Sequence, residues 1–219
     1  GENRNEIGAA VDNRQGEPSW APDGSAVYAT VQERGNVHLY RFPVSGAKPD
    51  KVIEEIGGRG ASWSVGEGDL FAFAAATPKD MAQLYVMRSG EIEQLTDLNR
   101  ELLAEREIAD VESFTFRSFD GLEIEAFITL PLGRSAGSKH PLIATIKGGP
   151  HGQDGPHFDY RNQVYAGLGW GSIKVNYRGS TGYGQGFADA IFGDQNGGEA
   201  KDVMYAVDAA VRRYGWVDP

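Results

Sequence analysis

The sequence contains no cysteine, and this absence excludes several classes of site at once. Disulfide bonds, thiolate nucleophiles, zinc ribbons and iron–sulfur clusters all need cysteine sulfur. Histidine is scarce as well, because the 219 residues include only four. Two of them stand close to carboxylates, but the cluster His151, Asp154, His157 and Asp159 lacks the i, i+4 spacing that aims two ligands at one ion. We therefore expect no metal site.

Positive charge and long apolar runs are lacking too. The chain has 21 Lys and Arg against 31 Asp and Glu, a net charge of −10. A phosphate-binding surface needs an excess of positive charge, so we expect neither nucleic acid nor an anionic membrane as a partner. No run approaches the ~18 apolar residues of a membrane span. The first eight residues do not resemble a signal peptide. Together with the absence of cysteine, the absence of a signal peptide slightly favours a cytoplasmic location. The chain begins with Gly1 and not with Met, however, so its natural N-terminus is not established.

The first half of the sequence repeats itself. Pro18-Ser19-Trp20 recurs as Ala61-Ser62-Trp63, 43 residues later, and residues 38–42 are echoed by residues 83–87. A period of ~40–45 residues with several short strands is typical of β-propeller blades, of which a complete propeller has ~4–8. A β-sandwich also consists of short alternating strands, but the period favours the propeller. We therefore expect about two blades of a partial propeller in residues 1–98.

Turn residues mark three hairpins. Pro22-Asp23-Gly24 precedes an alternating run, and Gly66 to Asp69 does the same in the second repeat. After a charged connector at residues 99–112, Phe119-Asp120-Gly121 separates two further alternating runs. Asp-Gly between such runs is a strong hairpin signal, so an antiparallel strand pair is expected here.

The second half changes period and predicts an α/β architecture. Residues 142–146 are a nearly continuous apolar run, which is typical of a strand buried on both faces. A helix bearing Phe158, Val164, Tyr165 and Leu168 follows, then a strand at residues 172–177, and then an amphipathic helix from Gly198. This order predicts that residues 113–219 form the first part of a doubly wound sheet, which binds ligands at the carboxyl ends of its strands.

Two motifs look catalytic but lack the required context. Gly-x-Ser-x-Gly occurs at residues 133–137, but Pro131 precedes it and no helix follows, so we interpret Ser135 as part of a solvated loop. The glycine-rich residues 178–186 match neither phosphate-binding pattern, and we expect no helix directly after them. A structural loop is favoured there.

Gly148-Gly149-Pro150 is the most informative short motif. It follows the buried strand, and two glycines let bare backbone N–H groups approach a ligand closely. In α/β-hydrolases the loop at this place supplies half of the oxyanion hole. The alternative is a tight turn without function.

Taken together, these motifs resemble the prolyl oligopeptidase family of serine peptidases, and most closely its acylaminoacyl-peptidase and dipeptidyl-aminopeptidase branch. The resemblance is strongest over residues 110–219, and the repeat in residues 15–97 agrees with that family's β-propeller joined to an α/β-hydrolase domain. It is carried by Lys147-Gly148-Gly149-Pro150-His151-Gly152, by residues 175–184, by Phe192-Gly193-Asp194, by Asp202-Val203 and by residues 215–219.

The resemblance implies where the chemistry lies. The nucleophilic Ser, the Asp and the His are expected beyond Pro219, so no catalytic triad residue is assigned to this chain. Gly149, together with Gly148, is implied as an oxyanion-hole donor. Lys147 departs from the His or Tyr usual in relatives, and could donate to the oxyanion or point to solvent. Arg178 and Tyr183 are implied as structural or pocket-wall residues.

The implied function is that of a serine-type peptidase, which hydrolyses short or acylated peptides through an acyl-enzyme without metal or organic cofactor. Its partner would be the C-terminal remainder of the same hydrolase, and whether the protein forms a homo-oligomer is left open. Alternatives are a non-catalytic fragment or interaction module, and an esterase of the same fold, which the repeat disfavours. Residues 172–177 would form an exposed sheet edge, so we expect the isolated chain to be poorly soluble.

Overall fold

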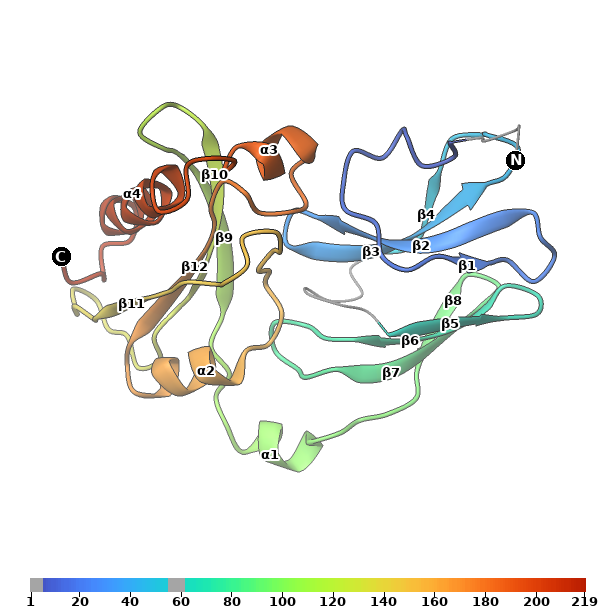
Figure 1. Ribbon diagram of the computed structural model, residues 1–219. Coiled ribbons are helices and arrows are strands. Elements are labelled where there is room, and N and C mark those ends of the chain that lie inside the picture. Colours follow the sequence, from blue (N-terminus) through green and yellow to red (C-terminus); the bar gives the residue numbers. More distant parts are fainter. Residues whose placement is uncertain (1–5, 55–61) are drawn as a thin grey trace.

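The computed structural model describes residues 6–54 and 62–219, which form two antiparallel sheets followed by a mixed sheet with helices (Figure 1). Residues 1–5 of the expected propeller region, and Ala61 of the second repeat, lie outside the described residues. None of the helices in the described part of the chain is long and apolar enough to cross a lipid bilayer.

The two antiparallel sheets have the same four-stranded order, with each strand next to its neighbour in sequence. The first sheet consists of β1 (Ser19–Trp20), β2 (Ala26–Glu33), β3 (Asn36–Pro43) and β4 (Asp50–Ile53). The second consists of β5 (Trp63–Gly66), β6 (Leu70–Ala75), β7 (Gln83–Arg88) and β8 (Glu91–Gln94).

The expected hairpins of both sheets are present. In the first, Gly24 has φ 71° and joins β1 to β2; in the second, Gly68 and Asp69 have φ 68° and 55° and join β5 to β6. One apolar core lies between the sheets and includes Tyr28 and Phe71, whose rings meet edge to face at 5.0 Å. The Tyr28 hydroxyl also donates to Asp69 at 3.0 Å. The two sheets therefore pack against each other through this core.

The mixed sheet has the order β11-β12-β10-β9, with β11 and β12 parallel and the other pairs antiparallel. Its strands are β9 (Val111–Arg117), β10 (Glu123–Thr129), β11 (Leu142–Thr145) and β12 (Gly171–Asn176). The helices are α1 (Arg100–Ala104) in the connector, α2 (Tyr160–Gly167), α3 (Gln185–Asp189) and α4 (Gly198–Arg213). The Asp120-Gly121 turn joins β9 to β10, as expected, with Gly121 at φ 88°.

Helices α2 and α4 lie on opposite faces of this sheet (Figure 1). Helix α4 packs Val203, Ala206 and Ala210 into a core with Ile173 of β12, which confirms its predicted amphipathic face. The next residue of β12, Lys174, points to the other face, where it meets Asp159 at the start of α2.

Two expectations about the strands are wrong. Strand β12 is not an edge, because it pairs with β10 on one side and β11 on the other, and all six of its residues are buried. The edge is β11, which has one neighbour among the described residues. For the same reason residues 142–146 are not buried on both faces: Ala144 is exposed and Ile146 is 65% exposed.

Two expectations about the helices also need correction. Helix α2 forms and is followed by Gly169 at φ 79°, but it buries Asn162 and Ala166 and leaves Val164 and Leu168 exposed. The small Ala166 side chain lets the helix approach the sheet closely, and larger apolar residues fall on the outer face. The short helix α3 begins at Gln185, so a helix does start within the second glycine-rich loop.

Candidate functional site

The loop after β11 exposes two adjacent glycines at the carboxyl end of the strand. Gly148 and Gly149 are exposed, and a Cβ on Gly148 would meet nothing within 4 Å. Gly149 has φ 126°, a conformation that L residues with side chains rarely adopt. Within the described part of the chain, neither glycine N–H donates a hydrogen bond. Both peptide groups are therefore exposed and unbonded at the N–H in the described residues.

A cavity of about 560 Å³ lies beside Gly148, between the end of β11 and the start of α2. Lys147 and Gly148 line it together with Asp159 and Lys174. Lys174 is buried, and its ammonium lies 2.6 Å from the Asp159 carboxylate, which also accepts the N–H groups of Arg161 and Asn162 as the N-cap of α2. Although burial acts in the opposite direction, the Lys174 ammonium holds the pKa of Asp159 below its usual value. The cavity wall is therefore charged and fixed.

Lys147 does not point to solvent, because the residue is only 7% exposed. Its Nζ donates to the carbonyl oxygen of Pro150 at 2.9 Å and lies 4.0 Å from the centre of the Tyr177 ring. The Tyr177 hydroxyl in turn donates to the carbonyl oxygen of Lys147 at 2.8 Å. The solvent-facing alternative from the sequence is therefore wrong.

The same loop is tied to the second glycine-rich loop, residues 178–186. The Thr181 N–H donates to the Gly152 carbonyl at 3.1 Å, and the Nδ1 of His151 lies 3.1 Å from the Gly179 carbonyl oxygen. Asn176, at the end of β12, exchanges two hydrogen bonds with the backbone of Asp154. The loops after the two parallel strands thus support each other.

The first sheet contacts this loop through the tip of the β2–β3 hairpin. Gln153 is 2% exposed, and its amide oxygen accepts the N–H of Gly35 at 3.1 Å while its Nε2 donates to the Asn36 carbonyl at 2.6 Å. The Arg34 N–H donates to the Gly182 carbonyl at 3.0 Å. Both glycine-rich loops are therefore bonded to one hairpin.

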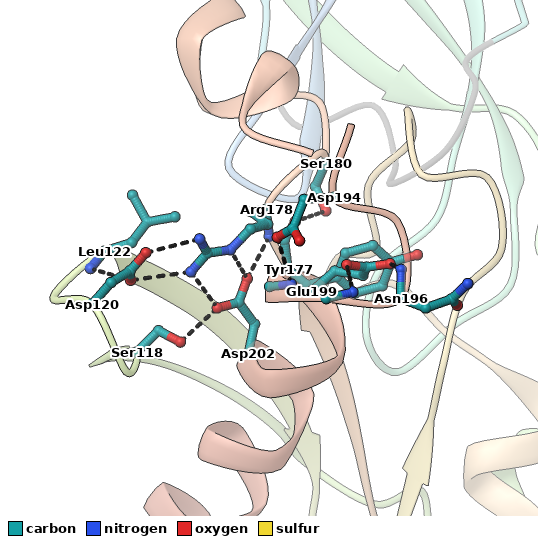
Figure 2. Close-up of polar contacts among 12 residues, drawn as sticks. Ser118, Asp120, Leu122, Tyr177, Arg178, Ser180, Asp194, Asn196, Glu199 and Asp202 are labelled. Carbon is teal, nitrogen blue, oxygen red and sulfur yellow. Dashed lines mark hydrogen bonds and ion pairs between the residues drawn. The ribbon is translucent and has the colours of Figure 1, made fainter. Parts of the chain in front are cut away.

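Arg178 is the centre of a buried ionic cluster (Figure 2). Its Nε and Nη2 donate to the two oxygens of Asp202 at 2.9 Å each, and its backbone N–H donates to the same carboxylate at 2.9 Å. Its two Nη atoms donate to Asp120 at 2.8 and 3.1 Å, and Ser118 donates to Asp202 at 2.5 Å. Asp202 is fully buried, so the cluster joins the β9–β10 turn, the end of β12 and helix α4.

The charges of this cluster stabilise one another. The hydrogen bonds from Arg178 lower the pKa of Asp120 to about 2. The hydrogen bonds to Asp202 and Asp120 raise the pKa of Arg178. Arg178 does not line the cavity beside Gly148. Of the two roles that the sequence left open for Arg178, the contacts are those of a structural brace.

Tyr183 lines a second cavity of about 340 Å³, between Arg34 and the strands β9 and β10. Its hydroxyl donates to Glu125 at 2.7 Å and accepts from Asn176 at 2.7 Å. Burial, and then the nearby Glu125 carboxylate, raise the pKa of Tyr183. Tyr183 is thus a wall residue of a cavity that is separate from the one beside Gly148.

The remaining motifs form no further site in the described residues. Ser135 is exposed, and its N–H donates to Ser138 within the same loop. No group of three His, Asp or Glu side chains within residues 6–54 and 62–219 is placed to hold a metal ion. The sequence interpretation missed Gln153, and it named Asp202 without assigning it a role. A carboxylate among the apolar residues of a predicted helix was the signal that could have revealed Asp202.

Comparisons with known proteins agree with these observations. A family model described as the prolyl oligopeptidase family matches residues 156–219. The chain is 31% identical over 205 residues to an uncharacterized peptidase, YuxL, of Bacillus subtilis, which covers 92% of this chain and 31% of that protein. It is 26% identical to dipeptidyl-peptidase 5 of Aspergillus fumigatus, over 91% of this chain and 28% of that protein.

Solved structures give the same result. The structure of Pyrococcus horikoshii acylaminoacyl peptidase matches with a TM-score of 0.83 and 27% identity, over 97% of this chain and 33% of that one. An acylaminoacyl peptidase in complex with Z-Gly-Gly-Phe-chloromethyl ketone matches with a TM-score of 0.82 and 26% identity. The 219 residues thus span about a third of the length of these relatives.

Proposed function

This chain belongs to the prolyl oligopeptidase family, and we propose that it is part of a serine peptidase that hydrolyses short or acylated peptides through an acyl-enzyme. The observation that supports this most directly is the loop after β11, where the peptide groups of Gly148 and Gly149 are exposed and Gly148 lines a cavity. Relatives named as dipeptidyl and acylaminoacyl peptidases support the substrate class.

In the proposed mechanism, Gly149, together with Gly148, donates backbone N–H groups to the oxygen of the tetrahedral intermediate. Donors that are fixed before the reaction stabilise the charge that develops in the transition state, and one such donor is typically worth about 10²–10³ in kcat. This role requires that the peptide groups be exposed and held still. The first condition is met by the open surroundings of both glycines.

We propose that the nucleophile and its partners come from a remainder of the protein outside these residues. The Gly-x-Ser-x-Gly at residues 133–137 is an exposed loop without a helix, so Ser135 is unsuited to the role. Strand β11 has a free edge in the described residues, where a further strand can add. Relatives three times as long support this partner.

The domain assignment follows the same proposal. The chain combines β-propeller and α/β-hydrolase elements, like its structural neighbours. Residues 1–98 would contribute about two propeller blades, residues 99–112 the connector, and residues 113–219 the first half of the hydrolase domain. Two four-stranded sheets in sequential order support the number of blades.

A fluorophosphonate probe, which phosphonylates activated serines with loss of fluoride, tests the proposal. We expect the full-length protein that contains these residues to be labelled on a serine outside them, and to hydrolyse an acyl-amino-acid or dipeptidyl anilide. Ser135→Ala should leave both signals unchanged. A full-length protein that is neither labelled nor active would contradict the proposal and favour a non-catalytic module; labelling with activity on esters alone would favour an esterase.

A further inference from the structure

We propose that Lys147 is a positioning residue, which holds the peptide groups of Gly148 and Gly149 through Pro150 and Tyr177 and does not itself donate to the oxyanion. This inference rests on the proposed function, because it concerns the same loop.

The first argument is the position of the ammonium. Lys147 is 7% exposed, and an ion removed from water must have partners within the protein. Two of its partners are the Pro150 carbonyl oxygen at 2.9 Å and the face of the Tyr177 ring at 4.0 Å. Cation–π attraction is stronger when water is excluded, so the ring binds this ammonium well. Both contacts draw the charge toward the interior of the loop.

The second argument is the closed set of contacts around the glycines. Lys147 and Pro150 flank Gly148 and Gly149 in sequence, and the carbonyl oxygen of each flanking residue is bonded. The Pro150 oxygen accepts from the Lys147 ammonium and from the Gly152 N–H, and the Lys147 oxygen accepts from the Tyr177 hydroxyl. The glycine pair is therefore held at both ends by one ring of contacts.

The third argument is that the glycines cannot hold themselves. Glycine has the largest backbone freedom of any residue, so two in succession make a mobile segment unless neighbours constrain it. A small misplacement of a catalytic group is enough to lower the rate strongly. Tyr177 is a rigid support, because the next residue, Arg178, is bonded to Asp202 through its backbone.

Direct donation to the oxyanion is the competing assignment, since Lys147 also lines the cavity. A double-mutant cycle in the full-length protein separates direct donation from positioning, with Lys147→Met, Tyr177→Leu and their combination.

We expect each single variant to lower kcat about 10–100-fold with KM changed less than about 3-fold. The double variant should lose little more, because both substitutions break the same ring of contacts. Lys147→Arg should restore kcat to within about 5-fold of the wild-type value, since a guanidinium can still donate a hydrogen bond and can stack on the Tyr177 ring.

The matched control is Lys139→Met. The Lys139 ammonium also donates to backbone carbonyls, those of Gly215 and Val217, but far along the chain from the glycines. Its loss should leave kcat unchanged. If Tyr177→Leu folds poorly, Tyr177→Phe keeps the ring and removes only the hydroxyl, and should lower kcat less than Lys147→Met.

Two kinetic results would overturn the inference: an unchanged kcat in Lys147→Met, or losses in the two single variants that multiply in the double variant. Hydrogen exchange of the Gly152 and Thr181 amides, which are bonded within and to the loop, supplies a readout without catalysis. Lys147→Met should accelerate their exchange at least about 10-fold, and Lys139→Met should not. A wild-type protein without hydrolytic activity would contradict the proposed function and would not test the role of Lys147. That role would be rejected if Lys147→Met left the hydrogen exchange of the two amides unchanged.

Discussion

Two glycine-rich loops lie side by side at the ends of the parallel strands, and they use glycine for different reasons. In the loop after β11, a Cβ on Gly148 would meet nothing within 4 Å. In the loop after β12, a Cβ on Gly179 would lie 2.9 Å from Ile191, and one on Gly182 would lie 2.2 Å from the Gln153 side chain. The first loop leaves space around Gly148 and Gly152, whereas the second is closely packed around Gly179 and Gly182.

This difference predicts that substitutions in one loop affect activity and that substitutions in the other affect stability. The packed loop needs glycine because neighbouring atoms and positive φ angles exclude a side chain, so substitutions there should cost stability. In the proposed mechanism the open loop needs glycine to present its peptide groups, so substitutions there should cost activity. Composition alone does not distinguish the two cases, since both loops are rich in glycine.

The largest expected effect is the loss of the cluster that supports the packed loop. Asp202→Ala removes a fully buried carboxylate and leaves the Arg178 guanidinium without its main partner. Breaking a buried ion pair in this way typically costs about 3–5 kcal/mol of unfolding free energy. Urea unfolding of the full-length protein measures the loss. Asp208→Ala, on the exposed side of the same helix, is the control, and an equal loss in both variants would contradict the role of the cluster.

The next effect should fall on activity. Gly149→Ala places a side chain at φ 126° and displaces the peptide group that we assign to the oxyanion hole. We expect kcat to fall about 100-fold, in the range for loss of one oxyanion donor. Anilide hydrolysis by the full-length protein measures it. Gly186→Ala, at an unstrained position of the packed loop with no atom within 4 Å of its Cβ, should keep the wild-type kcat.

A smaller loss is expected for Gly182→Ala, and it should appear in stability. The new methyl group meets Gln153 and the Arg34 backbone, at φ 92°. Backbone strain of this kind costs about 1–3 kcal/mol. Thermal unfolding of Gly182→Ala beside Gly186→Ala would reveal it. If both variants melt like the wild type, the distinction between a packed and an open loop is lost.

The smallest effect concerns pH. Because the pKa of Asp120 is lowered to about 2 from 3.8, its contribution to stability is fully present above about pH 4 and is lost as the pH falls through about 2. The Asp120 side chain is 41% exposed, so solvent screening limits the contribution to about 1 kcal/mol or less. The difference in unfolding free energy between wild type and Asp120→Asn should be constant from pH 7 to 5 and shrink toward pH 2. A pH-independent difference would mean that Arg178 does not depend on the Asp120 charge.

Local features of the fold were predictable because their causes are local. The Asp120-Gly121 turn and the apolar face of α4 depend on residues near one another in sequence, and both are confirmed. The burial of β11 was not predictable, since it depends on which strand lies beside it, and the order β11-β12-β10 places it at an edge.

The candidate site shows the same limit. Adjacent glycines after a strand identified the exposed loop, because their effect needs no distant partner. The inward direction of the Lys147 ammonium depends on Tyr177, which is 30 residues away, and the position of Gln153 depends on a hairpin 118 residues earlier. Such contacts follow from the three-dimensional fold and leave no short motif in the sequence.

The hydrogen bonds between Gln153 and the tip of the β2–β3 hairpin also link the first sheet to the loop after β11. Gly35 and Asn36 both use the Gln153 amide, which is buried. Any swing of the first sheet away from the mixed sheet must break both bonds or drag the segment that contains Gly149 with it. The position of the loop after β11 is therefore thermodynamically coupled to the position of the first sheet, through two bonds made by one buried side chain.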